Sequence, residues 1–217
     1  MRSYRIALIR HGRTSANDEQ VYIGKTDLPL SERGKAELGF MRESFTYPRP
    51  ERVYCSPLER ALQSSEALFP ETDITVVDDL REMDFGIFEG IKLDDAVKLD
   101  TYKKWLKGGL DNPPPNGESL REMLMRCYSS MNAIILDMMR QDIHNAAVMT
   151  HGGIISNILS CMGLPKAEPM NYLCSFGEGW LISVNAMLWQ NGGTFEIIGK
   201  IPEDIDDTED EDFADDT

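Results

Sequence analysis

Two of the three histidines in the chain stand where a short apolar run ends. His11 follows the run YRIALI (4–9) in the sequence RHGR, and His151 follows AAVMT (146–150) in the sequence THGG. A third run, RVYC, is followed by the sequence SPLER, which ends at Arg60. Short apolar runs suit buried strands of a parallel sheet, and ligands bind at the carboxyl ends of such strands. The pattern therefore predicts one site that gathers both histidines and the neighbouring arginines.

Arginine, glycine and histidine in this combination suit the transfer of a phosphoryl group. The side chains of Arg10 and Arg60 offer fixed cationic forks that match phosphate oxygens. Glycines beside His151 let backbone N–H groups approach an anion. Nearby positive charge lowers the pKa of His11 and keeps it a neutral nucleophile. Taken singly, each histidine could be a satisfied structural residue, but the two together favour a functional site.

A metal site is the other common use of paired histidines, and this sequence does not favour it. Adjacent arginines repel a cation, and no carboxylate stands at ligand spacing beside His11 or His151. The phosphate-binding sequences G-x-x-x-x-G-K-[ST] and G-x-G-x-x-G do not occur. We therefore expect neither a metal nor an organic cofactor.

Strands and helices alternate along the chain. The apolar runs predict strands at 4–9, 52–55, 74–77 and 146–150, and helices are expected at 32–46, from Ser56 to Phe69, from Glu118 to Arg140 and from His151-Gly152-Gly153 to Met162. The sequence QNGG between residues 180–189 and 194–200 predicts a β-hairpin. This order predicts an α/β fold, a three-layer α/β/α sandwich whose mostly parallel sheet has an antiparallel edge.

The sequence predicts one domain over residues 1–202 and an acidic tail over 203–217. Within the domain, residues 84–117 mix Gly, Pro, Lys and Asp, which predicts an excursion over the active site that shapes the substrate pocket. The tail holds 10 of the 37 acidic residues, so it is expected to be solvated. The hairpin near the end of the domain leaves two alternatives, a free sheet edge or a homodimer contact.

Charge and composition exclude several classes of protein. A net charge of −15 disfavours binding to nucleic acid, because phosphates would be repelled. No run approaches the ~20 apolar residues of a membrane span, so no membrane partner is expected. The N-terminus lacks a signal-peptide pattern, and none of the four cysteines forms a C-x-x-C pair. These features predict a cytoplasmic protein with reduced thiols.

Five motifs in the chain resemble those of the histidine phosphatase superfamily, the phosphoglycerate mutase-like enzymes, and they stand in the same order. LIRHGRTSAN resembles the R-H-G-x-T-x-x-N motif, and SPLERALQS resembles the S-x-L-x-R-A-x-Q-[ST] block. LREMDFGIFEG resembles the segment that supplies the proton donor, NGES a block of the phosphatase branch, and MTHGG the second-histidine motif. The resemblance covers the chain from residue 4 to about residue 164.

The resemblance implies a role for each matching residue. His11 corresponds to the nucleophile that becomes phosphohistidine, and Glu82 to the general acid, with Glu89 as its nearest rival. The implied phosphate pocket consists of Arg10, Arg60 and His151, with further substrate contacts from Asn17 and Gly152. Arg13 stands where many relatives carry Glu or Gln, and it would extend the basic pocket toward a second acidic group on the substrate.

The resemblance leaves a choice between hydrolysis and phosphoryl transfer. The mutase branch has E-R-H-Y-G around the acid and a longer insertion after it, whereas this chain reads REMDFG from Arg81 to Gly86. That segment is similar to the branch that includes α-ribazole phosphatase. We therefore expect a metal-independent phosphomonoester hydrolase that acts on a small phosphorylated metabolite. The alternatives are a phosphoglycerate mutase-type phosphoryl transferase and a catalytically inactive phospho-ligand binding protein.

Overall fold

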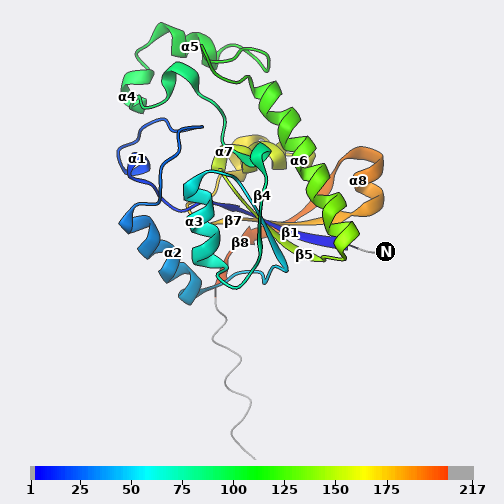
Figure 1. Cartoon of the computed structure of the whole chain (residues 1–217). Helices are drawn as coiled ribbons and strands as arrows, with labels where there is room; N and C mark the ends of the chain where they lie inside the picture. Colours follow the sequence, from blue (N-terminus) through cyan, green and yellow to red (C-terminus); the bar gives the residue numbers. More distant parts are fainter. Residues whose placement is uncertain (1–2, 205–217) are drawn as a thin grey trace, which may run out of the picture.

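The computed structural model describes residues 3–204, and its strands and helices follow the predicted alternation (Figure 1). The strands are β1 (Ser3–Arg10), β2 (Phe45–Thr46), β3 (Arg52–Cys55), β4 (Ile74–Val76), β5 (Asn145–Thr150), β6 (Gly163–Leu164), β7 (Gly179–Asn185), β8 (Phe195–Ile201) and β9 (Glu203–Asp204). The helices are α1 (Ser15–Asp18), α2 (Glu32–Ser44), α3 (Glu59–Leu68), α4 (Leu93–Ala96), α5 (Asp100–Leu106), α6 (Leu120–Gln141), α7 (Gly152–Met162) and α8 (Ala186–Gly192). Three short 3-10 helices are η1 (Asp78–Leu80), η2 (Gly86–Phe88) and η3 (Pro169–Tyr172).

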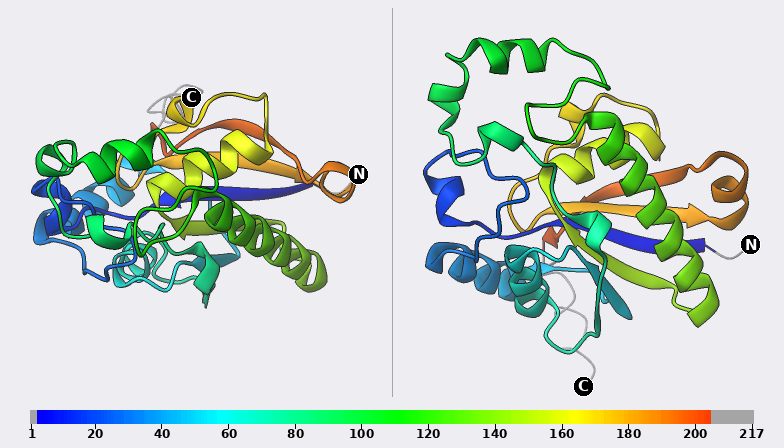
Figure 2. Two further views of the ribbon diagram at one scale, coloured as in Figure 1. Left: turned by 90° about the horizontal axis from the view of Figure 1, so that it is seen from above. Right: turned by 45° about the horizontal axis from the view of Figure 1, so that its top comes forward.

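The main sheet has seven strands in the order β4-β3-β5-β1-β7-β8-β6. Strands β4, β3, β5 and β1 run parallel to one another. On the other side of β1, β7 runs antiparallel to both β1 and β8, and β6 at the edge runs parallel to β8. Helices cover both faces of this sheet (Figure 2). The predicted three-layer sandwich with an antiparallel edge is confirmed.

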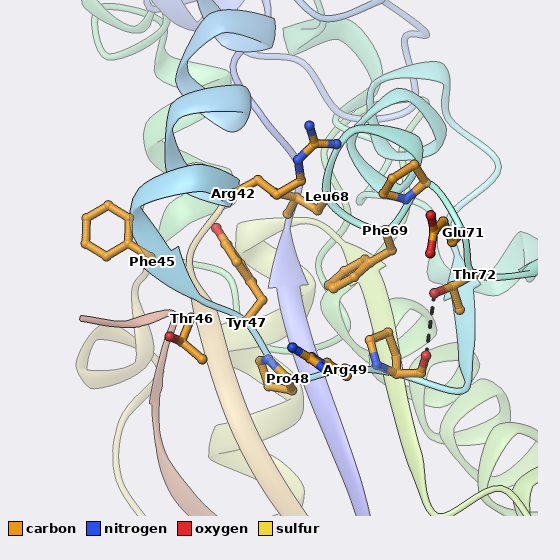
Figure 3. Close-up of a pocket in the computed structure, with 12 residues that line it drawn as sticks. Arg42, Phe45, Thr46, Tyr47, Pro48, Arg49, Leu68, Phe69, Glu71 and Thr72 are labelled. Carbon is orange, nitrogen blue, oxygen red and sulfur yellow. Dashed lines mark hydrogen bonds between the residues drawn. The ribbon is translucent and has the colours of Figure 1, made fainter. Parts of the chain in front are cut away.

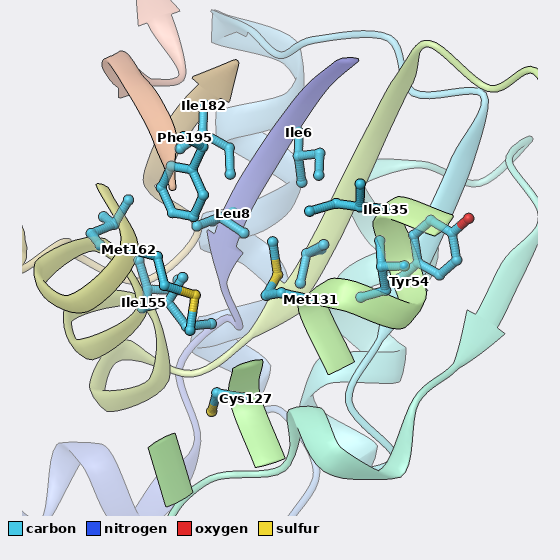
Figure 4. Close-up of a cluster of buried hydrophobic side chains, with 14 of the residues drawn as sticks. Ile6, Leu8, Tyr54, Cys127, Met131, Ile135, Ile155, Met162, Ile182 and Phe195 are labelled. Atoms are coloured by element: carbon cyan, nitrogen blue, oxygen red, sulfur yellow. The ribbon is translucent and has the colours of Figure 1, made fainter. Parts of the chain in front are cut away.

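Strand β1 reads as a continuous apolar run because both of its faces are covered. Ile6 and Leu8 pack against side chains of α6 and α7, whereas Ala7 and Ile9 face the core beneath α2 and α3. Figure 4 shows the first of these cores, where methionine and isoleucine side chains of the helices meet the strands. A strand buried on both faces has no reason to alternate with polar residues.

Helix α6 is fixed at its start by a reciprocal capping arrangement. The side chain of Ser119 accepts a hydrogen bond from the Glu122 amide, and the Glu122 carboxylate accepts one from the Ser119 amide. These two contacts satisfy donors that the first turn of a helix otherwise leaves unpaired. The helix begins close to the predicted position.

The connection between β7 and β8 differs from the predicted tight hairpin. The two strands pair antiparallel as expected, but residues 186–192 between them form helix α8. The Asn185 side chain caps this helix by accepting from the amides of Met187 and Leu188, and Gly193 ends it with a φ of +58°. The NGG sequence therefore ends a helix rather than forming a two-residue turn, because Gly193 supplies the left-handed residue that a helix end favours.

The predicted helices differ from the structure at two ends. The helix expected from Ser56 begins at Glu59, because the Ser56 hydroxyl contacts His151 instead of capping the first turn. The helix expected over 32–46 ends at Ser44, and Phe45 and Thr46 form β2, which pairs with β9. Helix α7 ends at Met162, as predicted, and Gly163 continues in an extended conformation as the start of β6.

The excursion over residues 84–117 holds η2, α4 and α5 and forms the arch drawn in green at the top of Figure 1. Phe88, Ala96 and Tyr102 form a small apolar cluster of their own, with Trp105 packed against it. Backbone hydrogen bonds tie the excursion to residues 20–22 near the N-terminus. Residues 20–27 and 84–93 therefore support each other.

The predicted acidic tail lies almost entirely outside the described residues. Its first two residues, Glu203 and Asp204, form β9, and residues 205–217 are not described. Within residues 3–204, no helix combines the length and the apolar character needed to cross a membrane.

Candidate active site

The two predicted histidines lie next to each other at the carboxyl ends of β1 and β5. These strands are parallel neighbours in which Arg10 is in register with Thr150, so the residue after each strand reaches the same edge. The His11 amide donates to the Thr150 carbonyl at 2.9 Å. The imidazole ring centroids of His11 and His151 are 5.0 Å apart, at 61° to each other.

The ring of His11 is held in one orientation and in one tautomer. Its Nδ1–H donates to the carbonyl oxygen of Gly12 at 2.6 Å, which leaves the lone pair on Nε2. The Gly12 amide donates in turn to the Ser64 hydroxyl at 2.8 Å. The hydroxyl of Ser64, at the end of the SPLERALQS block, therefore fixes the turn that carries His11.

His151 is fully buried, and only one of its ring nitrogens has a partner among residues 3–204. Its Nε2 lies 2.8 Å from the Ser56 hydroxyl, and its Nδ1 is buried with no hydrogen bond. The Leu58 amide donates to the Ser56 hydroxyl, so the hydroxyl hydrogen is free to donate to Nε2. In that arrangement His151 carries its proton on Nδ1, where it is available to a ligand.

Both histidines are neutral at ordinary pH. Burial lowers the pKa of His11 well below its usual range, and the positive charge of Arg60 lowers it further. Burial likewise lowers the pKa of His151, with His11 and Arg60 adding to the effect. A neutral imidazole with a free lone pair is a nucleophile, whereas an imidazolium is not.

Arg10 reaches the site from the last position of β1. Its Nη1 donates to the Cys174 carbonyl at 2.7 Å, and its guanidinium carbon lies 3.9 Å from the centroid of the Phe176 ring. Its Nε is buried without a hydrogen-bond partner among the described residues. A β-carbon at Gly152 would lie 3.1 Å from this Nε, so glycine permits the close approach of helix α7.

Arg60 lies in the first turn of α3 and is almost completely buried. Its Nη2 donates to the Gly24 carbonyl at 2.7 Å and its Nη1 to the Thr26 carbonyl at 2.9 Å. The amides of Gly24, Lys25 and Thr26 donate in turn to the carboxylate of Glu89. Glu89 therefore holds the loop whose carbonyls bind Arg60.

Glu82 lies against the N-terminus of α7. A β-carbon at Gly153 would stand 3.0 Å from Glu82 Oε1, so this glycine leaves room for the carboxyl group. Burial raises the pKa of Glu82, and this effect outweighs the amides of Met83 and Gly153 and the charge of Arg60. A carboxyl group with a raised pKa is a better proton donor near neutrality than an ordinary one.

Arg126, on α6, holds the segment that carries Glu82, and the sequence did not single it out. It forms a two-pronged ion pair with Glu118, at 2.7 Å and 2.8 Å. It also donates to the backbone carbonyls of residues 79, 81 and 82, at 2.7, 2.7 and 3.2 Å. Both side chains are nearly buried, with 8% and 13% of their surface exposed. In the sequence, only the NGES block, which contains Glu118, indicated either partner of this ion pair.

Asn17 and Arg13, two of the predicted substrate contacts, differ in their surroundings. The Asn17 Oδ1 accepts hydrogen bonds from the amide and the hydroxyl of Thr14, which leaves the Asn17 Nδ2 donors for a ligand. The side chain of Arg13 lies 4.5 Å from the Phe176 centroid and is already paired with Asp18 and Glu37. Phe176, which contacts both Arg10 and Arg13, belongs to a stretch in which no single residue stood out in the sequence.

The third histidine and two buried cysteines lie outside this site. His144 stacks on Tyr4 and is partly exposed, and the buried thiols of Cys55 and Cys127 have pKa values raised to about 12 by burial. No group of three or more His, Cys, Asp or Glu side chains within residues 3–204 is arranged to hold a metal ion. A groove of about 480 Å³, lined by Arg42 and by residues 45–50 and 68–72, lies near the end of α3 and the start of β3 (Figure 3). It is therefore at the end of the sheet opposite to the histidines.

Comparison with known proteins places this arrangement in a family. The chain belongs to the histidine phosphatase superfamily (branch 1), whose profile matches residues 6–195. The adenosylcobalamin/alpha-ribazole phosphatase of Salmonella typhimurium is 28% identical over 169 residues, which cover 76% of this chain and 82% of that protein. The 2,3-bisphosphoglycerate-dependent phosphoglycerate mutase 2 of Gloeobacter violaceus is 31% identical over 170 residues, covering 71% and 73%.

Solved structures agree on the fold. The crystal structure of the alpha-ribazole phosphatase from Shigella flexneri superposes with a TM-score of 0.71 at 24% identity, over 90% of this chain and 95% of that chain. At this level of identity the likeness concerns the fold alone. The relatives by sequence include proteins named as phosphatases and as mutases, so the choice between the two reactions depends on the site.

Proposed function

We propose that the protein is a phosphomonoester hydrolase that works through a phosphohistidine intermediate on His11 and needs no metal. One observation carries the proposal: the buried His11 keeps its Nε2 lone pair free beside a second neutral histidine and two arginines. A protein that only binds phosphate needs cationic and N–H donors but no oriented nucleophile. The substrate is a small phosphorylated metabolite.

In the first step, His11 Nε2 attacks the phosphorus atom as the bond to the leaving oxygen breaks. Protonated Glu82 gives its proton to that oxygen, and the alcohol departs. Arg10, Arg60 and the Nδ1–H of His151 stabilise charge on the three equatorial oxygens. The backbone N–H groups at Gly152 and the Asn17 Nδ2 add further donors to the phosphoryl group.

In the second step, the Glu82 carboxylate takes a proton from a water molecule, whose oxygen attacks the phosphorus. The N–P bond breaks, inorganic phosphate leaves, and His11 returns to its neutral form. The same carboxyl group thus serves as acid and then as base, and its raised pKa suits both roles near neutrality. Each step balances without an external cation, because the arginines supply the positive charge.

Hydrolysis of p-nitrophenyl phosphate in excess EDTA tests the proposal, with wild type compared to His11→Ala. We expect turnover by the wild type and its loss in the variant. His144→Ala is the matched control, because it removes the one histidine that lies outside the site and stacks on Tyr4. Thermal unfolding of each variant confirms that the fold survives.

Two results would contradict the proposal. Full residual turnover by His11→Ala would remove the nucleophile from the mechanism, and loss of wild-type turnover on chelation would show that a metal is required. Interconversion of phosphoglycerates without release of inorganic phosphate would identify the alternative, a mutase-type transferase.

A further inference from the structure

The phosphate-binding arginines differ from the other cations near the site in how their charges are paired. Within residues 3–204, neither Arg10 nor Arg60 has a carboxylate within ion-pair distance, and both use backbone carbonyls as partners instead. A carbonyl orients a guanidinium without cancelling its charge. These two residues therefore keep their full attraction for a phosphoryl group.

Arg13, the next cation outward, has its charge already neutralised. Its Nε lies 3.2 Å from Glu37 Oε2 and its Nη1 lies 3.5 Å from Asp18 Oδ1. The guanidinium also lies 4.5 Å from the centroid of Phe176, whose ring is itself 5.9 Å from that of His11. Arg13 is thus beside the reacting histidine but is paired with Asp18 and Glu37, carboxylates that it shares with Arg33, so it is not a free basic extension of the pocket.

Lys25, in the loop that binds Arg60, is also paired with a carboxylate. It lies between Gly24 and Thr26, whose carbonyls bind Arg60, and its Nζ donates to Asp84 at 2.7 Å. Lys25 also lines a recess of about 310 Å³ that contains one other cation, Arg81, and three carboxylates, Asp84, Glu118 and Glu122. Arg81 is itself paired with Asp79. Both cations of this recess are therefore already paired with carboxylates.

We infer that the substrate carries a single phosphate and no second anionic group: its leaving group is an uncharged alcohol. The inference rests on the proposed function and narrows its substrate class. A carboxylate or second phosphate on the leaving group would have to displace Asp18, Glu37 or Asp84 from an existing ion pair. It would also approach those carboxylates at short range, where like charges repel.

Two three-carbon esters test the inference, because they differ in one group. Glycerol 3-phosphate and 3-phosphoglycerate differ only by a hydroxymethyl group in place of a carboxylate. Release of inorganic phosphate gives kcat/KM for each, and p-nitrophenyl phosphate serves as the reference substrate. We expect kcat/KM to be about tenfold or more higher for glycerol 3-phosphate, the effect of one unfavourable charge contact of about 1.4 kcal/mol.

A double variant tests whether the ion pairs cause the preference. Asp18→Asn with Glu37→Gln removes the carboxylate partners of Arg13 and Arg33, and we expect the ratio of kcat/KM between the two esters to narrow about tenfold. The matched control is Glu32→Gln with Asp95→Asn, which makes the same change of charge at carboxylates paired with Lys35 and Lys98. That control is expected to leave the ratio unchanged.

The outcomes separate the inference from the proposed function. Equal or faster hydrolysis of 3-phosphoglycerate by the wild type would overturn the inference while leaving the hydrolase intact. An unchanged ratio of kcat/KM for the two three-carbon esters in the Asp18 and Glu37 double variant would show that the ion pairs of these carboxylates do not cause the preference. No phosphate release from any of the three esters would overturn the proposed function, and the inference with it.

Discussion

Arg126→Met is expected to lower the free energy of unfolding and also to displace Glu82, the proton donor. Arg126 donates to the backbone carbonyls of residues 79, 81 and 82, and it pairs with the nearly buried Glu118. Loss of the three carbonyl hydrogen bonds is expected to cost about 3 kcal/mol. The stranded charge of Glu118 raises the total loss in free energy of unfolding to about 5 kcal/mol.

A second variant separates these two effects. In Glu118→Leu with Arg126→Met no buried charge is stranded, so we expect most of the charge-related loss to be recovered. The carbonyl contacts remain absent, so the segment that carries Glu82 stays unsupported. Urea unfolding measures the stability of both variants, and Arg121→Met is the control, since that arginine lies exposed on the same helix in an ion pair with Asp111.

The catalytic consequence is read from two esters with different leaving groups. p-Nitrophenyl phosphate needs little help from an acid, whereas glycerol 3-phosphate needs a proton on its leaving oxygen. In the double variant we expect hydrolysis of the alkyl ester to fall about 100-fold more than that of the aryl ester. Equal slowing of both esters, or a double variant no more stable than Arg126→Met alone, would refute the reasoning.

Two further predictions concern the acid and the nucleophile directly. Glu82→Gln should slow esters with poor leaving groups far more than activated ones, and equal slowing would instead implicate Glu89 or water. The pH profile of kcat/KM should be bell-shaped, because the first step needs neutral His11 and protonated Glu82. Activity is lost as pH falls through the lowered pKa of His11 and as pH rises through the raised pKa of Glu82, and Glu82→Gln should flatten the alkaline limb. A wild-type profile that rises steadily above neutrality would contradict both assignments.

The sequence was sufficient to place the centre of the site because parallel strands end at a common edge. His11 and His151 each follow an apolar run, so the adjacency of β1 and β5 brings them together. The identity of the neighbouring strands was not predictable in the same way. Nothing in residues 180–185 indicated that β7 would lie directly against β1, because strand order depends on packing between distant segments.

The contacts that hold the site residues in place were harder to predict from the sequence. Arg126 stands in a helix whose pattern indicates an apolar face, and its partners lie up to 47 positions away along the chain. Ser56 has the sequence features of a helix cap, yet α3 begins at Glu59 and the Ser56 hydroxyl contacts His151, which lies 95 positions away along the chain. The pairing of Arg13 depends on Glu37 from α2, which only the folded chain brings close.

The most direct test of the account is detection of the phosphoenzyme. Glu82→Gln, given p-nitrophenyl phosphate, should still be phosphorylated but should lack the base that activates water, so the intermediate should accumulate. After quenching in base, intact mass spectrometry is expected to show the addition of one phosphoryl group, located on His11 by peptide analysis and lost in mild acid. Absence of this species from a protein that releases p-nitrophenol with a burst, or its presence in His11→Ala with Glu82→Gln, would contradict the proposed mechanism.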